Sequence, residues 1–431
     1  MKKKYVIYGI GKEYEKQKQY FEKLKIVAYV DNTKKGEIIS ECKRIISIEE
    51  LSEYKFDWII ITNQKCTNEI IEELIHANNT YEDKIILLRD FINESRFIEL
   101  FFREIQESKF LNLSVHSQNS ENIYYIIAPA NLKSGGPELL HQLAYELRRL
   151  GKNVYIAYDG CKDQEPNECI PNEYIKYIDQ NVIRVEDIPD ENKSTIILPE
   201  TKCNWLEKFE RAYIFLWWMS VDNMFINISN KSLKMIYSNV DKHLYQSEYA
   251  RGFLKQIGIP DNKIAELSDY INEIYIQDTT KNTIIKKVNI VAYNPAKGRL
   301  FTQKIIREMP ETKFVAIQNM TNTEVFELLK KSKVYIDFGN HPGKDRIPRE
   351  AAMLGCCVIT GRRGAAGNDI DVCIPDKYKF DESKCDIADI CEQIKECLDN
   401  YEENISDFEE YREKIRTEKS LFEKQVKEIF K

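Results

Sequence analysis

The stretch HPGKDRIPREAAMLGCCVITGRRGAAG, from His341 to Gly367, decides the fold and marks the predicted site. It follows the strand-sized run KVYIDFGN and contains a glycine loop, a helical pattern rich in small residues and a second strand, CCVITG. Parallel strands joined by helices form open α/β sheets, which bind ligands beyond the carboxyl ends of their strands. The stretch therefore predicts a Rossmann-like lobe whose ligand site lies in this glycine loop.

Positive charge gathers in the same stretch. Lys344 and Arg346 lie in the loop, and Arg349 and Glu350 open the helix that follows. The whole chain has a net charge of -7, which argues against nucleic acid as a partner. In such an acidic chain, the local excess of positive charge predicts an anionic ligand. Because the free N–H groups of a helix start favour anions, a diphosphate suits the position. A solvated basic loop is the alternative.

Length and composition set further limits. The 431 residues predict about three domains. Eleven cysteines without a Cys-x-x-Cys pair, and no apolar run long enough for a leader or a membrane span, predict a cytoplasmic protein with reduced thiols. The basic patch of Arg148, Arg149 and Lys152 is either a peripheral contact with anionic lipid at the inner face of the membrane or a solvated helix end.

The first part of the chain predicts a Rossmann-like accessory domain over residues 1–112. The strand KYVIYGIG carries Gly9 and Gly11, and the next strand ends at Asp31, which together form half of a dinucleotide fingerprint. Tyr14 stands where the third glycine belongs, and its side chain should push the helix away from a pyrophosphate. Dinucleotide binding and a nucleotide-free module that recruits or orients the rest both stay open.

A second α/β unit is predicted from residue 121. The strand NIYYIIAP leads into a loop with Gly135 and Gly136. A helix is predicted from Pro137 to Leu150, with Gly151 just past its end. Two adjacent glycines let the backbone approach a ligand closely at the helix start. An ordinary tight turn between strand and helix is the alternative.

The run GGPELLHQLAYELRRLGKNVYI, Gly135–Ile156, resembles the opening loop and helix of the N-terminal lobe in family 4 and related retaining glycosyltransferases of GT-B fold. The stretch from His341 resembles the donor-site segment of the same enzymes. The resemblance spans residues 121–430. It implies an acceptor lobe over residues 121–275, a nucleotide-sugar donor lobe over residues 286–395, and a charged C-terminal helix over residues 396–431 that packs back on the first lobe.

The resemblance also implies roles for single residues. Glu350 matches the carboxylate that binds the donor ribose, whereas the family's earlier glutamate, eight positions before, is replaced by Pro342. Lys297, Lys344 and Arg346 are expected to neutralise the leaving diphosphate, which makes the reaction metal-independent and, by resemblance, retaining. The other predicted donor-binding residues are Gly135, Gly136, Arg299, His341, Gly343, Arg349, Gly364 and Ala365.

Two further motifs concern the acceptor and a metal. Asp222 and its neighbours Ser220 and Asn223 follow the buried run YIFLWWM, so we expect them at a strand's carboxyl end on the acceptor side, with Asp222 as a catalytic group. Asp369 and Asp371 form an Asp-x-Asp motif, the metal signature of the GT-A class. It falls late in the chain, after a glycine turn, so we expect these residues to be structural and predict neither a metal nor a cofactor.

The predicted function is transfer of a hexose-like residue from a nucleotide-diphosphate donor to a hydroxyl of a glycan or lipid-linked glycan, in cell-surface polysaccharide biosynthesis. A non-catalytic subunit that binds a nucleotide sugar or a glycan is one alternative. A nucleotide-sugar epimerase of the same two-lobed architecture is another, although it needs acidic and imidazole groups around the sugar and the five histidines are scattered.

Overall fold

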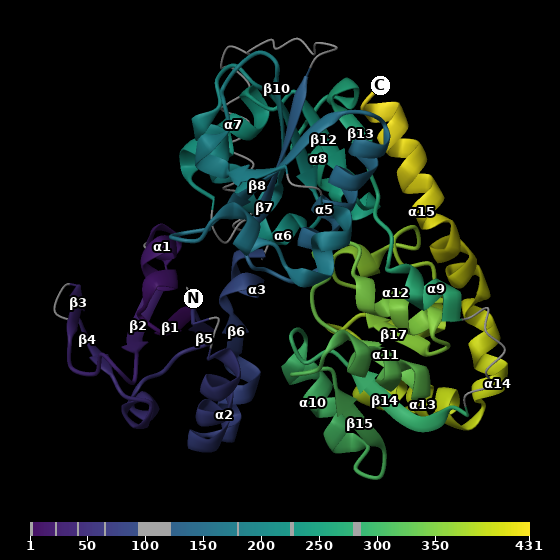
Figure 1. The fold of residues 1–431 in the computed structure, drawn as a ribbon. Helices are drawn as coiled ribbons and strands as arrows, with labels where there is room; N and C mark the ends of the chain where they lie inside the picture. The colour runs from purple at the N-terminus through teal and green to yellow at the C-terminus, as the bar shows by residue number, and fades with distance from the viewer. Residues whose placement is uncertain are drawn as a thin grey trace. The chain divides into compact units, whose positions relative to one another are not determined.

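The computed structural model describes residues 3–21, 24–40, 43–63, 66–93, 122–178, 181–224, 228–278 and 286–431. These residues fall into two compact units, one up to residue 93 and one from residue 122 onward (Figure 1). The predicted end of the first domain near residue 112 lies outside the described residues. Within the described ranges, no helix is long and apolar enough to cross a bilayer.

The first unit is a sheet of parallel strands with one antiparallel pair, β3 and β4, at its edge. The strand order is β3-β4-β2-β1-β5-β6. The edge pair was not predicted, because strands this short carry no alternating apolar pattern. The elements are β1 (Lys4–Tyr8), α1 (Lys12–Phe21), β2 (Lys25–Val30), β3 (Ile38–Ser40), β4 (Lys43–Ile46), β5 (Trp58–Ile61), α2 (Thr67–Ala77), β6 (Ile85–Leu87) and α3 (Leu88–Asn93).

The incomplete dinucleotide motif of this unit is closed by its own side chains. The Tyr14 ring is 3% exposed and stacks on Phe21 with ring centroids 5.6 Å apart. The Asp31 carboxylate accepts hydrogen bonds from the N–H of Ile10 at 2.7 Å and from the Thr33 hydroxyl at 2.7 Å. The carboxylate that would hold a ribose is therefore bound to the glycine loop itself.

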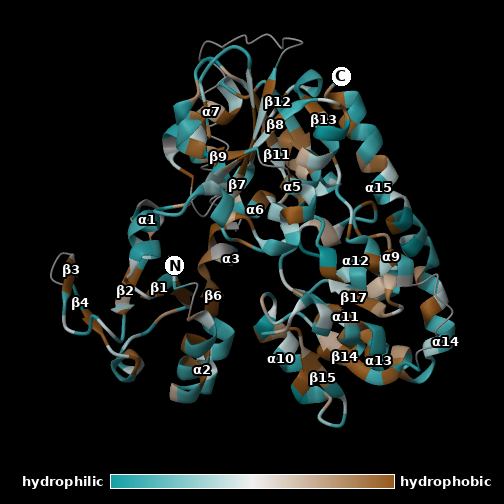
Figure 2. Ribbon diagram, viewed as in Figure 1, coloured by the Kyte–Doolittle hydropathy of each residue, from teal (hydrophilic) through white to brown (hydrophobic). Residues whose placement is uncertain are grey.

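The first lobe of the second unit is a parallel sheet with the order β13-β12-β11-β10-β7-β8-β9. Its core includes Trp217 and Trp218, both fully buried, and the apolar residues in Figure 2 follow the strands and the helix faces that cover them. The elements are β7 (Ile123–Pro129), α5 (Gly135–Arg149), β8 (Asn153–Asp159), β9 (Val182–Arg184), β10 (Ser194–Pro199), β11 (Tyr213–Trp218), α6 (Val221–Met224), α7 (Asn230–Ser238), β12 (Lys242–Tyr245), α8 (Glu248–Gln256) and β13 (Ile264–Glu266). Helix α9 (Glu273–Asp278), which follows in the chain, packs in the core of the second lobe through Tyr275.

From the sequence alone we expect the run KMIYSN, residues 234–239, to form a strand of this lobe. This prediction is wrong, because residues 234–238 lie in helix α7. Ser229 caps this helix, since its hydroxyl accepts the N–H of Ser232 at 3.0 Å. Leu233 and Ile236, three residues apart, are both buried. The apolar residues therefore follow a helical period, which a run of six residues does not reveal on its own.

The second lobe is a parallel sheet with the order β15-β14-β16-β17-β18. Its central strand β16 ends at Asp337, and the predicted site loop connects it to helix α12. The elements are β14 (Val288–Tyr293), α10 (Arg299–Glu308), β15 (Lys313–Ala316), α11 (Asn322–Lys331), β16 (Ser332–Asp337), α12 (Arg346–Met353), β17 (Cys357–Gly361), β18 (Lys379–Phe380), α13 (Ile387–Asp399), α14 (Tyr401–Asn404) and α15 (Glu409–Ile429).

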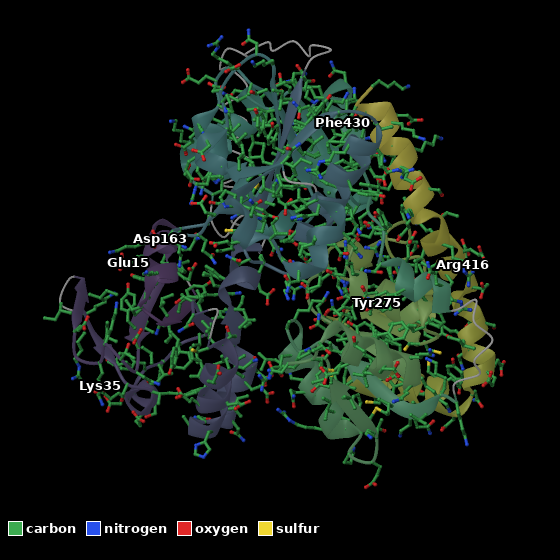
Figure 3. All side chains as sticks on the ribbon, viewed as in Figure 1. Glu15, Lys35, Asp163, Tyr275, Arg416 and Phe430 are labelled. Carbon is green, nitrogen blue, oxygen red and sulfur yellow. The ribbon has the colours of Figure 1, made fainter. Side chains whose placement is uncertain are left out.

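The long helix α15 belongs to the cores of both lobes. Tyr411 and Ile415, in its first half, pack in the second lobe's core. Phe422 and Val426, in its second half, pack in the first lobe's core together with Phe430 (Figure 3). The helix therefore runs from the second lobe back onto the first.

Candidate active site

Two glycine turns bring the loops after β14 and β16 into backbone contact. Gly298 has φ +60°, and a Cβ atom there would lie 2.3 Å from the carbonyl carbon of Phe338. Gly339 has φ +95°, and its Cβ would lie 2.5 Å from the Gly298 nitrogen. Only glycine accepts both the left-handed backbone and the close approach. The contact brings Lys297 to the end of β16, while Arg299 begins helix α10.

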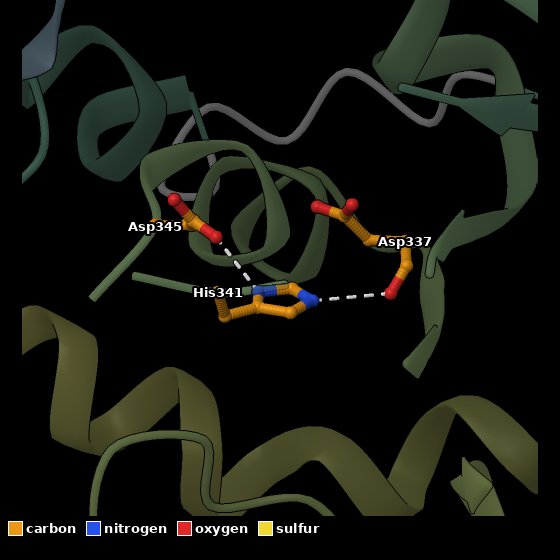
Figure 4. A group of neighbouring side chains, drawn as sticks. All are labelled: Asp337, His341 and Asp345. Carbon is orange, nitrogen blue, oxygen red and sulfur yellow. Dashed lines mark hydrogen bonds and ion pairs between the residues drawn. The ribbon is translucent and has the colours of Figure 1, made fainter. Parts of the chain in front are cut away.

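Four polar side chains meet at the end of β16. The His341 Nδ1 atom lies 2.7 Å from Asp345 Oδ2, and its Nε2 atom lies 3.2 Å from the backbone carbonyl oxygen of Asp337 (Figure 4). The Lys297 ammonium contacts Asp345, lies 3.3 Å from Asp337 Oδ1, and lies 3.1 Å from His341 Nδ1. Asp337 also accepts the Tyr335 hydroxyl at 2.8 Å. We call Lys297, Asp337, His341 and Asp345 the strand-end cluster.

Charge in the strand-end cluster is largely balanced within it. Burial alone would lower the pKa of Lys297, but the carboxylates of Asp337 and Asp345 outweigh burial and raise it. Burial alone would raise the pKa of Asp345, but Lys297 and His341 hold it well below its usual range. Lys297 is therefore a charged ammonium with two carboxylate partners.

Three members of the strand-end cluster have the chemistry of metal ligands. One ligand atom from each of Asp337, His341 and Asp345 lies within 4.8 Å of the others. The Lys297 ammonium contacts all three residues, so it supplies the positive charge that a metal ion would bring. A divalent ion would have to displace this ammonium, so the cluster suits Lys297 better than a metal.

Lys344 and Arg349, two of the predicted site residues, form ion pairs with buried carboxylates. The Arg349 guanidinium, fully buried, lies 2.5 Å from Asp269 and 2.7 Å from Glu418 in helix α15. The Lys344 ammonium lies 2.6 Å from Glu418 and donates to the Ser268 hydroxyl at 3.2 Å. Two cations and two carboxylates therefore neutralise each other in the interior, and neither cation faces an open diphosphate site.

Arg346 reaches the first lobe. As the first residue of α12, it donates from its guanidinium to Glu138 Oε2 at 2.5 Å and to Gln142 Oε1 at 3.5 Å, both in α5. A Cβ atom on Gly135 would lie 3.0 Å from the Arg346 side chain, and one on Gly136 would lie 3.7 Å from Met219. The structure thus brings Arg346 of the donor segment together with the predicted glycine loop of the first lobe.

Glu350 lies one turn inside helix α12 and does not open it. The N-cap is Asp345, so Glu350 is the fifth helical residue and cannot cap the helix start. Its half-buried side chain faces Arg346, Arg349 and Glu138, and the Tyr275 hydroxyl donates to it. Burial raises the pKa of Glu350 to about 7, although the two arginines act against this shift.

Asp222 joins the two lobes from helix α6. Its carboxylate is 3% exposed and accepts the Tyr249 hydroxyl at 2.9 Å and the Asn340 side-chain amide at 2.5 Å. Asn340 belongs to the second lobe, in the loop that follows β16. The neighbouring Ser220 is held by buried Glu200, which accepts the Ser220 N–H at 3.1 Å and its hydroxyl at 2.6 Å. The carboxylate of Asp222 therefore lies at the junction of the lobes.

The Asp-x-Asp motif is engaged in internal contacts. Asp371 accepts the backbone N–H groups of Glu248 and Tyr249 at 2.8 and 3.0 Å, so it caps helix α8 of the first lobe. Asp369 pairs with Lys379 at 2.7 Å. The two carboxylates therefore have different partners and do not form one ligand pair.

Small residues around His341 allow the loops to pack backbone to backbone. A Cβ atom on Gly343 would lie 1.8 Å from the Met219 carbonyl oxygen, and one on Gly364 would lie 2.0 Å from the His341 carbonyl oxygen. The N–H of Ala365 donates to that same oxygen at 2.8 Å. Gly343 thus lies at the contact between the lobes, and Gly364 and Ala365 fix the loop that carries His341.

Sequence analysis missed Glu200, Asp337 and Asn340 as parts of this site. Asp337 ends β16, Asn340 follows it, and Glu200 directly follows β10. A signal was present, because polar residues at the carboxyl ends of parallel strands meet at one edge of a sheet. Glu138, in the first turn of α5, was not assigned to the site either.

Comparisons with known proteins agree with this architecture. A family model described as C2185-like, N-terminal, matches residues 1–86, which lie in the first unit. No curated protein matches the chain. Sucrose-phosphate synthase from Thermosynechococcus elongatus is 12% identical with a TM-score of 0.51, over 72% of this chain and 98% of its own.

Two further solved structures are similar at lower scores. HepE from Anabaena, in complex with UDP-glucose, is 8% identical with a TM-score of 0.49, over 71% of this chain and 98% of its own. UDP-GlcNAc 2-epimerase from Methanocaldococcus jannaschii is 13% identical with a TM-score of 0.40, over 64% of this chain and 92% of its own. The second unit has the GT-B fold, with two Rossmann-like lobes. The predicted fold class is confirmed.

Proposed function

We propose that the chain is a glycosyltransferase that moves a sugar from a nucleoside-diphosphate donor to a hydroxyl of a glycan or lipid-linked glycan. The observation that carries this proposal is the meeting of Arg346 with the glycine loop of the opposite lobe, while Glu350 lies one turn further along the same helix. A nucleotide sugar needs a cation that binds its phosphates, a carboxylate that binds its ribose hydroxyls, and backbone without side chains that it can approach closely. These groups meet at the junction of two lobes of GT-B fold, which is where this architecture leaves room for two substrates.

In the proposed reaction, Arg346 stabilises the negative charge that grows on the leaving diphosphate. Preorganised charges of this kind can carry most of a barrier reduction, since they need no rearrangement during the reaction. Glu350 binds the ribose hydroxyls, and its raised pKa means that part of the population is protonated near neutral pH. Asp222, between Tyr249 and Asn340, lies on the acceptor side.

The charge balance changes the sequence-based mechanism in one respect. Lys344 and Arg349 are neutralised by Asp269 and Glu418, and Lys297 is held by Asp337 and Asp345. Lys344 therefore supports the site through the packing of α15 and does not bind the diphosphate. Arg346 becomes the principal counter-charge of the leaving group.

The proposed reaction assigns no task to a metal ion. Retention of the sugar's anomeric configuration is proposed from the family resemblance alone. Asp371 caps α8 and Asp369 pairs with Lys379, so a metal at the Asp-x-Asp motif would have to break both contacts. Strong chelator is expected to leave turnover unchanged. The assignment to surface-polysaccharide biosynthesis in the cytoplasm, with a lipid-linked acceptor at the inner face of the membrane, stays a prediction.

Two other functions each have one observation in their favour. The engagement of Lys344 and Arg349 in the interior suits a non-catalytic subunit that binds a nucleotide sugar or glycan. The strand-end cluster places an imidazole beside the Asp345 carboxylate and within 4.8 Å of a carboxylate oxygen of Asp337, and an epimerase needs acidic and imidazole groups of this kind. Neither alternative explains why Arg346 meets the glycine loop of the first lobe.

One experiment separates the three functions. The protein is incubated with a panel of nucleotide sugars, with and without glycan acceptors, while nucleotide release and the identity of the sugar are followed. A glycosyltransferase releases nucleotide and does so faster with its acceptor. An epimerase changes the sugar without depending on an acceptor, and a binding subunit does neither. Failure of every nucleotide sugar to bind would overturn the proposal.

A further inference from the structure

One ion pair of the candidate site joins the two lobes directly. Arg346 comes from the start of α12 in the second lobe, and Glu138 comes from the first turn of α5 in the first. The guanidinium Nη1 lies 2.5 Å from Glu138 Oε2. The two side chains are 14% and 15% exposed, so solvent still reaches both groups. The pair therefore lies at an accessible position between the lobes.

The other cations of the site have deeper partners. Lys344 and Arg349 share Asp269 and Glu418, whose side chains are 1% and 3% exposed. Removing a cation from such carboxylates would leave buried charge without a partner, which is strongly unfavourable. Arg346 differs from them, because its ion-pair partner among the described residues, Glu138, is itself partly exposed and not deeply buried.

Glu138 keeps a partner if Arg346 leaves it. The Tyr177 hydroxyl donates to Glu138 Oε1 at 3.1 Å, on the carboxylate oxygen opposite the one that Arg346 contacts. Tyr177 belongs to the first lobe, so this hydrogen bond does not depend on the second. A guanidinium binds a carboxylate and a phosphate through the same planar fork of N–H donors. A phosphate group can therefore replace Glu138 on Arg346 at little cost to either residue.

We propose that Glu138 is an internal anion that holds Arg346 in the donor-free protein, and that the diphosphate of the donor displaces it. The inference rests on the proposed function, because it assigns the diphosphate to Arg346. It makes Glu138 a specificity-determining residue, since an anion must compete with its carboxylate to reach the guanidinium. A diphosphate competes better than a singly charged group because it carries more charge and more acceptor oxygens.

The proposal gives Glu138 an effect opposite to that of an ordinary binding residue. Removing its charge should tighten the binding of inorganic pyrophosphate, whereas removing Arg346 should weaken it. The matched control is Glu173→Gln, which removes the same charge from another first-lobe glutamate, one that pairs with Lys133 at 2.7 Å. Any general effect of net charge on anion binding would then appear in both variants.

The test is calorimetric titration of the full chain with inorganic pyrophosphate at fixed ionic strength. We expect Glu138→Gln to lower the Kd about tenfold, equivalent to roughly 1.4 kcal/mol, and Arg346→Gln to raise it by a similar factor. Glu173→Gln should stay within about twofold of wild type. An unchanged or higher Kd in Glu138→Gln would overturn the proposal, and so would equal tightening in both glutamate variants.

A second variant covers a failure of Glu138→Gln to fold. Glu138→Asp keeps the charge but retracts the carboxylate, so it should lower the Kd by a smaller factor, and an unchanged Kd would count against the proposal. A failure of this inference can be told apart from a failure of the proposed function. Pyrophosphate binding that depends on Arg346 and Glu138, without any sugar transfer, would refute the proposed glycosyltransferase activity and support this inference. Transfer with no tightening in Glu138→Gln would do the reverse.

Discussion

Glu350 is the residue whose protonation state the structure makes testable. Its folded pKa is about 7, against an ordinary value of 4.5, so the folded protein binds more protons than the unfolded chain between those pH values. This group therefore stabilises the fold fully at low pH, and its contribution is lost as pH rises through about 7. Glu350→Gln cannot titrate and should escape this loss.

The expected result is a stability difference between Glu350→Gln and wild type that moves in favour of the variant by about 3 kcal/mol from pH 4.5 to pH 8. Chemical denaturation at several pH values measures it. Tyr275→Phe, which removes the hydroxyl that donates to Glu350, should raise the pKa further and steepen the wild-type trend. A difference between Glu350→Gln and wild type that does not vary with pH would show that Glu350 titrates normally.

Lys297 tests the charge balance of the strand-end cluster. Lys297→Met removes the ammonium from two carboxylates, and breaking a buried pair from one side destabilises by about 3–5 kcal/mol. Added Mn²⁺ or Zn²⁺ should restore part of the lost stability, because Asp337, His341 and Asp345 then have metal-ligand chemistry without a competing cation. Thermal unfolding with and without metal measures both effects.

Lys286→Met is the control for this substitution, because Lys286 is exposed. It should change neither the stability nor the response to metal. Wild-type stability in the Lys297→Met protein would contradict the charge balance described here.

The residue scale is also where sequence reasoning was least complete. It assigned Arg346, Glu350 and the glycines at positions 135 and 136 to one donor site, because helix starts and glycine loops have local signals, and the structure brings Arg346 beside Gly135. It did not foresee that Lys344 and Arg349 pair with Glu418, since Glu418 lies 69 residues beyond Arg349, in a helix for which the sequence predicted packing but no partner for these cations. A sequence shows where a cation lies along the chain but not which carboxylate folds against it.

At the scale of elements, helix α15 holds the two lobes in one unit. Phe422 is fully buried in the first lobe's core and contacts the Tyr270 ring, with centroids 5.3 Å apart. Phe422→Ala should lower the free energy of unfolding by about 3–5 kcal/mol, through lost burial and the cavity left behind. The exposed neighbour Lys424→Ala should change it by less than about 0.5 kcal/mol. Equal effects of the two changes on urea denaturation would refute this packing.

Element types were predictable where the pattern was long. The strands NIYYIIAP and YIFLWWM and the helix from Gly135 to Arg149 were all recognised, because each carries a sustained apolar pattern. The run KMIYSN was misread, since six residues fit both periods. Strands β3 and β4 were missed because their pairing depends on neighbouring strands, and their own short sequences do not indicate it.

At the scale of the whole molecule, the first unit should be dispensable for donor binding. Its dinucleotide motif is closed by Tyr14 and Asp31, and the candidate site uses residues of the second unit alone. A fragment that begins at residue 117 is expected to bind nucleoside diphosphate within about twofold of the full chain. Circular dichroism confirms folding of the fragment. A folded fragment without affinity would assign part of the donor site to the first unit.

The overall architecture followed from sequence because strands alternate with helices along nearly the whole chain, which leaves few topologies open. The contacts that join the lobes did not follow. Arg346 with Glu138, Asp222 with Asn340 and Asp371 with α8 each join residues more than 100 positions apart. No local pattern encodes such pairs, and three-dimensional packing alone selects them.

The central claim is that a nucleoside diphosphate binds beside Glu350. The most direct measurement is calorimetric titration of UDP, GDP and ADP into wild-type protein and Glu350→Gln at pH 8, where the Glu350 carboxylate is ionised. The account predicts that at least one nucleotide binds wild type and binds the variant about tenfold more weakly, a loss of roughly 1.4 kcal/mol. Equal affinity in the two proteins, or no affinity for any of the three nucleotides, would contradict it.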